Sequence, residues 1–342
     1  MIDWADPKRT DVIRFIMVDP NNLDETYGEI DDAQLGSSDI TYGYYTDTRY
    51  SSKITFLADN NYIKNTWIRI IHEVPTEDYT NELGTFIPTS PVKNYKGANT
   101  ITLDLQSPLW GLTNDLTTAK FSVAKNTSYL DAFRRVCETC NRPYLFQNPN
   151  DYMAQQAAVY DVGESYLSIL FDLANAAGNR IELDGHGRIV LSPNVDRLSL
   201  SPIWTLDTDD KRSLIIEGTI KMESEVDELP SRAIVINGNN VGVADLADGV
   251  EYSAAQRGYI KAEKYSNSAA TTAANARSLA QAYLDSASKI TNYTLNTMYF
   301  PAKCGDNVSF NLYGEKHTCM IQSIDPVNLK TMTMGLTLRE VG

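Results

Sequence analysis

Cys137 and Cys140 form the clearest chemical motif of the sequence, a C-x-x-C within AFRRVCETCNRP. Such a pair could carry redox chemistry or supply half of a zinc site. A zinc site needs two more ligands, and the other cysteines, Cys304 and Cys319, lie far away without a second short-spaced pair. The two thiols also follow a helical pattern of apolar residues. We therefore expect them to pack as small hydrophobic side chains.

The other titratable residues form no catalytic pattern. The histidines, His72, His186 and His317, have no i, i+4 partner of the metalloprotease type, and the sequence contains no nucleophile elbow, Walker loop or dinucleotide-binding glycine pattern. The acidic stretches 19–32 and 207–210 lack the spacing of a helical calcium-binding loop. We predict no catalytic, cofactor-binding or metal-binding residues and no cofactor, and we expect His186 to lie exposed in a turn.

The composition indicates a folded protein that does not grip nucleic acid. A chain of 342 residues suggests two or three domains at roughly 100–200 residues each. The formal net charge of −14 argues against nucleic-acid binding through clustered Lys and Arg. It does not exclude nucleic acid passing nearby, because an acidic surface repels phosphates and would not retain DNA. No apolar run approaches the roughly 20 residues that span a bilayer. The N-terminus also lacks the basic start and apolar block of a secretory signal.

Alternating hydrophobicity predicts strands at both ends of the chain. The stretch TITLDLQ (100–106) places apolar and polar side chains on opposite faces, as TMTMGLTLREV near the C-terminus also does. We predict that residues 1–112 form an antiparallel barrel or sandwich and that β-structure resumes near Trp204. Between these C-terminal strands, SAATTAANARSLAQAYLDSASKI predicts a long helix rich in alanine.

Residues 113–202 have α+β character. The predicted elements are two helices, near 128–140 and 164–177, and a hairpin over 180–192 that turns through DGHG. Ser128 precedes an acidic residue by three positions, which is typical of a capping box at a helix start. Gly178 suits the left-handed position that ends a helix. The order of elements hints at two related barrels, although no sequence repeat is obvious.

Three stretches of the chain, in this order, resemble the tail hub or baseplate hub proteins of phages. They are WIRIIHEVPTEDYTNELGTFIPTSP (67–91), YDVGESYLSILFDLANAAGNRIELDGHGRIVLSP (160–193) and ARSLAQAYLDSASKITNYTLNTMYFPAKCGDNVSF (276–310). They resemble, respectively, the family's Arg-bearing strand followed by LGTF, its helix leading into a hairpin with an Asp-Gly turn, and its long helix before a Pro-x-x-x-Gly-Asp-x-Val strand entry.

The resemblance implies a mainly β fold with α+β insertions, in which two tail-tube-like antiparallel β-barrels are joined by smaller α/β domains. The implied domains are a first barrel (1–112), a joining domain (113–202), a second barrel (203–240 plus 290–342) and an inserted segment with the alanine-rich helix (241–289). The chain ends directly after its predicted closing strand. We therefore expect no peptidoglycan hydrolase within it, and receptor binding by a separate chain.

The resemblance also implies partners. Three copies would place six similar barrels in a ring, which meets the sixfold tail tube or distal tail protein above and a threefold tip, spike or receptor-binding protein below. The tape-measure protein and DNA would occupy the lumen, without sequence-specific binding. The expected role is a structural, non-enzymatic adaptor that forms part of the DNA-ejection channel. We expect it at the tail tip of the virion, after synthesis in the host cytoplasm without a signal peptide and without a membrane span.

Two other functions fit parts of the sequence. The tyrosine-rich stretch TYGYYTDTRY (41–50) is compatible with a carbohydrate-binding module for host adhesion, although its tyrosines equally suit barrel strands and subunit contacts. The 44 acidic residues would allow a cell-wall hydrolase that works with a carboxylate pair. No pair is singled out by the sequence.

Overall fold

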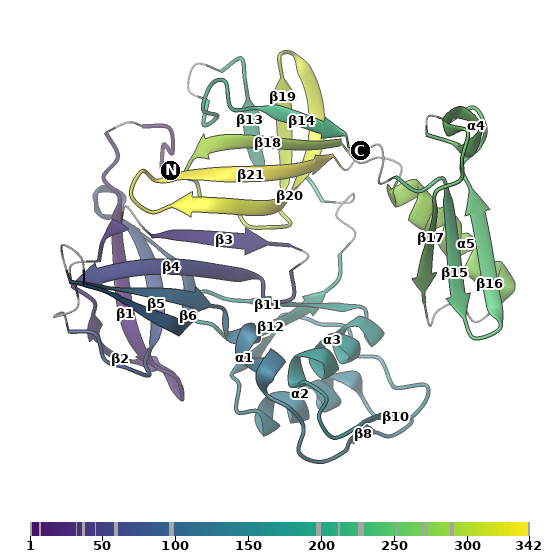
Figure 1. Ribbon diagram of the computed structural model, residues 1–342, viewed down its shortest axis with the longest axis horizontal. Coiled ribbons are helices and arrows are strands. Elements are labelled where there is room, and N and C mark those ends of the chain that lie inside the picture. Colours follow the sequence, from purple (N-terminus) through teal and green to yellow (C-terminus); the bar gives the residue numbers. More distant parts are fainter. Residues whose placement is uncertain are drawn as a thin grey trace.

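The computed structural model describes residues 2–6, 8–31, 33–35, 38–44, 46–57, 61–95, 99–195, 200–210, 213–224, 229–250, 252–267, 270, 272–287 and 291–340. Within these ranges the chain is mainly β, with two smaller α+β units beside a 13-stranded sheet (Figure 1). The fold class predicted from the sequence is therefore confirmed. The helices of these ranges include none with the length and apolar character needed to cross a membrane.

The first seven strands form what we call the N-terminal half of the large sheet. They are β1 (Val12–Asp19), β2 (Asn22–Glu29), β3 (Asp39–Gly43), β4 (Tyr50–Leu57), β5 (Trp67–Val74), β6 (Tyr79–Asn94) and β7 (Thr100–Gln106). All pair antiparallel in the order β3-β4-β7-β6-β5-β1-β2. Alternation fixes the register: Ile54 opposite Leu103 faces the core, and Lys53 opposite Asp104 faces away.

Six later strands form the C-terminal half of the sheet. They are β13 (Trp204–Asp207), β14 (Lys221–Ser224), β18 (Thr291–Met298), β19 (Asn307–Leu312), β20 (Glu315–Asn328) and β21 (Thr333–Glu340). Their order is β14-β18-β21-β20-β19-β13, and β20 also pairs with β3 of the N-terminal half. The two halves therefore form one sheet, and the strand pairing among the described residues does not close into a barrel.

The two halves share one strand order. With β2 left aside, the six strands of each half, counted along the chain, lie in the order second, third, sixth, fifth, fourth, first. One pair differs, because β1 and β5 are antiparallel whereas β13 and β19 are parallel. The order of elements in the sequence suggested two related units, and the two halves of the sheet with their shared strand order are those units.

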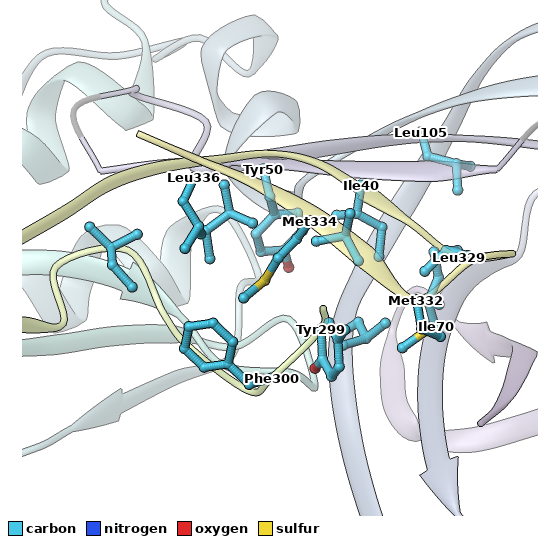
Figure 2. Packing of buried hydrophobic residues seen from close by; sticks show 14 of the residues in the cluster. Ile40, Tyr50, Ile70, Leu105, Tyr299, Phe300, Leu329, Met332, Met334 and Leu336 are labelled. Atoms are coloured by element: carbon cyan, nitrogen blue, oxygen red, sulfur yellow. The ribbon is translucent and has the colours of Figure 1, made fainter. Parts of the chain in front are cut away.

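A single hydrophobic core extends across both halves. Ile40 and Ile70 of the N-terminal half and Phe300 and Met334 of the C-terminal half are all at most 2% exposed, and Figure 2 shows them converging with Tyr299. Burial of large apolar side chains on both sides of the junction contributes roughly 1.5–3 kcal/mol for each of them. The halves are thus held together by packing as well as by the β3–β20 pairing.

The α+β unit follows β7. Its elements are α1 (Pro108–Asn114), β8 (Phe121–Val123), α2 (Tyr129–Thr139), β9 (Tyr144–Phe146), β10 (Ala158–Tyr160), α3 (Tyr166–Ala176), β11 (Asn179–Leu183) and β12 (Ile189–Pro193). The helices α2 and α3 and the β11–β12 hairpin lie where the sequence predicts them. Ser128 caps α2 by accepting a bond from the Asp131 amide at 3.2 Å, and Gly178 has a φ of +64° just after α3.

A second unit is inserted between β14 and β18. It contains β15 (Arg232–Asn237), β16 (Asn240–Asp245), α4 (Ala254–Arg257), β17 (Ala262–Ser266) and α5 (Ala273–Ala287), the last being the predicted alanine-rich helix. β15 pairs with β16 and β17 in a separate three-stranded sheet, which differs from the sequence division that grouped 203–240 with the second barrel. The reason is local: β15 and β16 form a tight hairpin whose two turn residues are Gly238 and Asn239.

Candidate functional site

The side of the large sheet that faces away from the core is polar. In the N-terminal half this polar face consists of Thr41, Ser51, Lys53, Thr102, Asp104 and Gln106. A groove of about 670 Å³ runs along it, with Thr89, Ser90 and Trp110 in its wall. The Lys53 ammonium lies 3.4 Å from the Asp104 carboxylate, and both side chains are about half exposed. Such an exposed pair contributes little to stability, so the face presents mainly hydroxyl and amide groups.

The polar face continues onto the C-terminal half. Thr294 pairs with Thr337, which also lies opposite Ser323. At the boundary between the halves, the Thr41 hydroxyl donates a hydrogen bond of 2.7 Å to the Asp325 carboxylate. Partial burial raises the pKa of Asp39 at this boundary; Lys53 opposes the shift and Asp325 adds to it. One polar surface therefore covers both repeats.

The β11–β12 hairpin docks its turn on β6, and we call this contact the hairpin joint. The Thr85 hydroxyl of β6 donates to the Gly185 carbonyl at 2.8 Å. The His186 Nδ1 lies 2.5 Å from the Glu82 carboxylate. A Cβ at Gly185 would lie 2.4 Å from the Glu82 Cβ, so only glycine fits this approach. The position of His186 in a turn predicted an exposed side chain. The side chain is instead only 34% exposed, because the turn packs on β6.

Buried polar groups support the joint from beneath. Arg69 is 6% exposed, and its Nε donates to the Thr85 hydroxyl at 3.2 Å while its Nη2 donates to the Leu23 carbonyl at 2.7 Å. The Tyr50 hydroxyl donates to the Thr85 carbonyl at 3.0 Å. Satisfied buried networks of this kind fix one relative position of the elements they connect. The hairpin joint therefore sets where the α+β unit lies against the sheet.

A cleft of about 590 Å³ lies beside the joint, and its charged side chains hold neighbouring elements together. Arg180 pairs with Glu182 at 2.8 Å and stacks 3.6 Å from the Tyr44 ring centroid. Arg49 donates from Nε to the Ile181 carbonyl at 3.1 Å, and burial, with repulsion from Arg180, lowers the pKa of Arg49. These charges connect the hairpin to the segment between β3 and β4.

The tyrosine-rich stretch 41–50 belongs to this interior. The Tyr42 hydroxyl donates to the Leu83 carbonyl at 2.6 Å, and burial raises the pKa of both Tyr42 and Tyr50. Tyr44 lies beneath the Arg180 guanidinium, and Tyr45 lies outside the described residues. The three described tyrosines pack between elements, so they do not form the exposed aromatic platform that the carbohydrate-binding hypothesis requires.

The C-x-x-C thiols lie at the end of α2 and pack against apolar neighbours. Burial raises the pKa of Cys137 and raises that of Cys140 to about 11. Burial also raises the pKa of Cys304 and of Cys319 to about 12. Since the thiolate is the nucleophile and the metal ligand, the raised pKa values disfavour the reactive form of these thiols near neutral pH. Within the part of the chain that the structure describes, no three metal-ligand side chains cluster together.

The remaining singled-out residues have separate structural contacts. His72 is fully buried on β5, with its Nε2 2.7 Å from the Asp11 carboxylate and its ring against Tyr299. Burial raises the pKa of Asp11, but hydrogen bonds from His72 and Arg9 outweigh it and leave that pKa below its ordinary value. His317 lies 3.0 Å from Glu340, far along the chain from the other two histidines.

The acidic stretches 19–32 and 207–210 each begin with an aspartate that caps a turn, and most of the first stretch is the strand β2. Asp207 accepts bonds from the Asp209 amide at 2.8 Å and from Asn311 at 2.9 Å, and these contacts lower its pKa. In the stretch 19–32, Asp19 accepts from the Asn21 amide at 2.7 Å, and residue 32 lies outside the described ranges. These carboxylates therefore act as turn caps.

Solved structures match this fold over nearly the whole chain, although no protein-family model and no curated protein matches the sequence. The tail protein from Neisseria meningitidis is 14% identical, with a TM-score of 0.69 and 97% of each chain covered. The 43 kDa tail protein of prophage MuSo2 from Shewanella oneidensis is also 14% identical, with a TM-score of 0.64 over 96% of this chain and 98% of that one. The chain has the fold of phage tail proteins.

A third solved structure has the same tail-protein fold. The prophage tail protein gp18 from Listeria monocytogenes is 10% identical, with a TM-score of 0.56 over 95% of this chain and 94% of that one. At these identities the likeness establishes the fold and not the individual contacts. The resemblance that the sequence carries is therefore confirmed at the level of the fold.

Proposed function

We propose that this chain is a structural tail hub of a phage virion, and that it assembles as a homotrimer. The observation that carries the proposal is the strand order that both halves of the large sheet share. Three chains would present six similar halves in a ring, while each chain has one α+β unit and one inserted unit. Such a ring is close to sixfold where the halves lie and threefold elsewhere, and can join a sixfold tube to a threefold tip.

The polar face supports a channel. If the six halves turn this face inward, the lumen is lined mainly by side chains such as Ser51, Thr102, Gln106, Thr294 and Thr337. Hydroxyl and amide groups neither hold phosphates as Lys and Arg clusters do nor expose apolar surface to the contents. DNA and the tape-measure protein would therefore pass without sequence-specific contacts.

The proposal places the chain at the tail tip, with a distal tail protein or the tail tube above it and a tip, spike or receptor-binding protein below. The two halves of the large sheet as the tube-like units, the α+β unit as the joining domain, and the inserted unit, which includes β15, are parts of the same proposal. A non-enzymatic role agrees with thiols whose pKa values are raised and with carboxylates that serve as turn caps and joint contacts.

Electron microscopy of the purified chain tests the proposal directly. Negative-stain images at high concentration, with and without a distal tail protein from the same phage, are expected to show ring particles with threefold symmetry and a lumen. Monodisperse monomers at every concentration, together with no binding to the distal tail protein, would contradict the hub assignment.

A further inference from the structure

We propose that the cleft beside the hairpin joint is a binding site for a small organic anion, a phosphate or carboxylate group carried on a compact apolar body. The proposal goes beyond the tail-hub function and does not depend on it. The site lies where three parts of one chain meet: the β11–β12 hairpin, β6, and the segment 299–304 that follows β18.

The cleft has the size and the lining of a small-molecule site. Its volume of about 590 Å³ falls within the roughly 300–1,000 Å³ of typical ligand pockets. Leu83 of β6, Val190 of β12 and Met334 of β21 supply an apolar lining, and each of them is buried. The rings of Tyr50 and Tyr299 line the cleft as well (Figure 2). The apolar body of a ligand therefore finds a matching surface.

Each described carboxylate that lines the cleft already has a cationic partner. The pairs are Glu182 with Arg180 at 2.8 Å, Asp184 with Arg188 at 2.6 Å, and Glu82 with Arg69 at 3.8 Å. The Glu82 carboxylate also contacts His186 at the hairpin joint. The negative charges of the cleft are therefore balanced within the chain, before any ligand binds.

Two cations of the cleft lack a carboxylate partner among the described residues. The Arg49 Nε donates to the Ile181 carbonyl, and its Nη1 donates to the carbonyls of Tyr44 and Thr46. These bonds leave the Arg49 Nη2 without a hydrogen-bond acceptor in the described part of the chain. Lys303 is exposed and also forms no ion pair with a described residue. The cleft is therefore positive in a chain whose formal net charge is −14.

The positive charge acts across the cleft. Burial and repulsion from Arg180 lower the pKa of Arg49, while attraction to Glu182 and Asp47 opposes the shift. Burial raises the pKa of the Cys304 thiol, and the same two guanidinium groups oppose that rise from the hairpin side. An anion between these walls relieves the repulsion. Guanidinium groups bind two oxygen atoms of a phosphate or carboxylate at once, which favours these groups over a halide.

A bound anion connects parts of the chain that are distant in sequence. Its oxygen atoms meet Arg49, from the segment between β3 and β4, and Lys303, from the segment after β18. Its apolar body lies against the β11–β12 hairpin and β6. A ligand that binds only the closed arrangement stabilises that arrangement by mass action. Binding is therefore expected to hold the α+β unit more firmly against both halves of the large sheet.

Isothermal titration calorimetry with three probes separates the anionic group from the apolar body. The probes are phenyl phosphate, phenol and inorganic phosphate. We expect phenyl phosphate to bind the full chain most tightly, with an affinity that falls as salt is added. In Lys303→Gln its binding is expected to weaken about tenfold, because one charge-assisted contact is lost. Lys125→Gln is the matched control, since Lys125 is an exposed lysine outside the lining of the cleft.

Hydrogen exchange measured with saturating phenyl phosphate locates the bound probe. Amides of β11, β12 and the segment 299–304 are expected to exchange more slowly, while those of β15 and β16 in the inserted unit keep their rates. Slower exchange confined to other segments would overturn the location.

The remaining outcomes test each part of the ligand assignment. Phenol that binds as tightly as phenyl phosphate would overturn the role of the cations. Inorganic phosphate that binds as tightly would overturn the role of the apolar lining. No binding of phenyl phosphate, or an equal loss in Lys303→Gln and Lys125→Gln, would overturn the site itself. These measurements do not involve ring formation, so the tail-hub proposal is tested separately by electron microscopy.

Discussion

Replacing Gly242 by alanine tests how the inserted unit is held together. Gly242 lies on β16 where α5 crosses it, and an added Cβ would lie 2.1 Å from the Ala276 carbonyl carbon and 2.2 Å from the Arg277 amide nitrogen. Ordinary contact begins at 3.4 Å, so helix and strand must separate by about 1.3 Å, the difference between 3.4 and 2.1 Å. Both neighbours are backbone, so no side-chain rotation relieves the clash.

The cost should fall at the upper end of the range for an overfilled core. Inserting a methyl group into a packed core costs about 1–3 kcal/mol, and a cost of about 3 kcal/mol raises the opened population roughly 100-fold. The unit has little stability in reserve, because five of the seven buried residues of its own core are alanines. Because this core is separate from that of the large sheet, the effect should stay local.

Hydrogen exchange measured by mass spectrometry resolves this prediction by region. In Gly242→Ala, amides of β15, β16, β17 and α5 are expected to exchange about 100-fold faster, while those of β4 and β7 keep their wild-type rates. Gly249→Ala is the matched control, since no atom lies within 4 Å of its added Cβ. Unchanged protection in the inserted unit, or equal loss of protection in the large sheet, would refute the reasoning.

Three further predictions concern buried polar groups. Because hydrogen bonds from His72 hold the pKa of Asp11 below its ordinary 3.8, the stability this carboxylate gives is complete above that pH and lost as pH falls below it. In Asp11→Asn, the free energy of unfolding measured with urea should therefore fall less steeply as the pH drops below 3.8. The same fall as in the wild type would contradict this. Thr85→Val removes the donor to Gly185 and should cost about 1 kcal/mol; full hairpin protection by hydrogen exchange would show that the bond contributes nothing. Cys137→Ser should cost about 1–3 kcal/mol by thermal unfolding; a loss no larger than that of Cys137→Ala would argue against an apolar packing role.

Local signals in the sequence were sufficient for α2, α3 and the β11–β12 hairpin of the α+β unit. The cap at Ser128 and the stop at Gly178 are decided by a few neighbouring residues, so spacing alone placed α2 and α3. Alternation likewise placed β7 and β21. The short α1 was missed inside the predicted β region, although Pro108 at its first turn is a start signal, and Leu109 and Leu112 supply its buried side.

Contacts between distant segments were not accessible to the same reasoning. The hairpin joint links Thr85 to Gly185, which are 100 residues apart, and no spacing rule announces such a pair. The repeat of strand order was also hidden, because the two halves share topology and not sequence. It becomes visible only through strand pairing.

The β3–β20 junction also constrains how the chain can be made. Thr41 and Asp325, which meet across it, are 284 residues apart. A ribosome that adds roughly 5–20 residues per second leaves β3 without this partner for roughly a quarter of a minute to a minute. During that time the nascent N-terminal half presents β3 as an unpaired edge of its sheet. Slow, non-local completion of this kind makes synthesis, more than the finished molecule, the stage most exposed to aggregation.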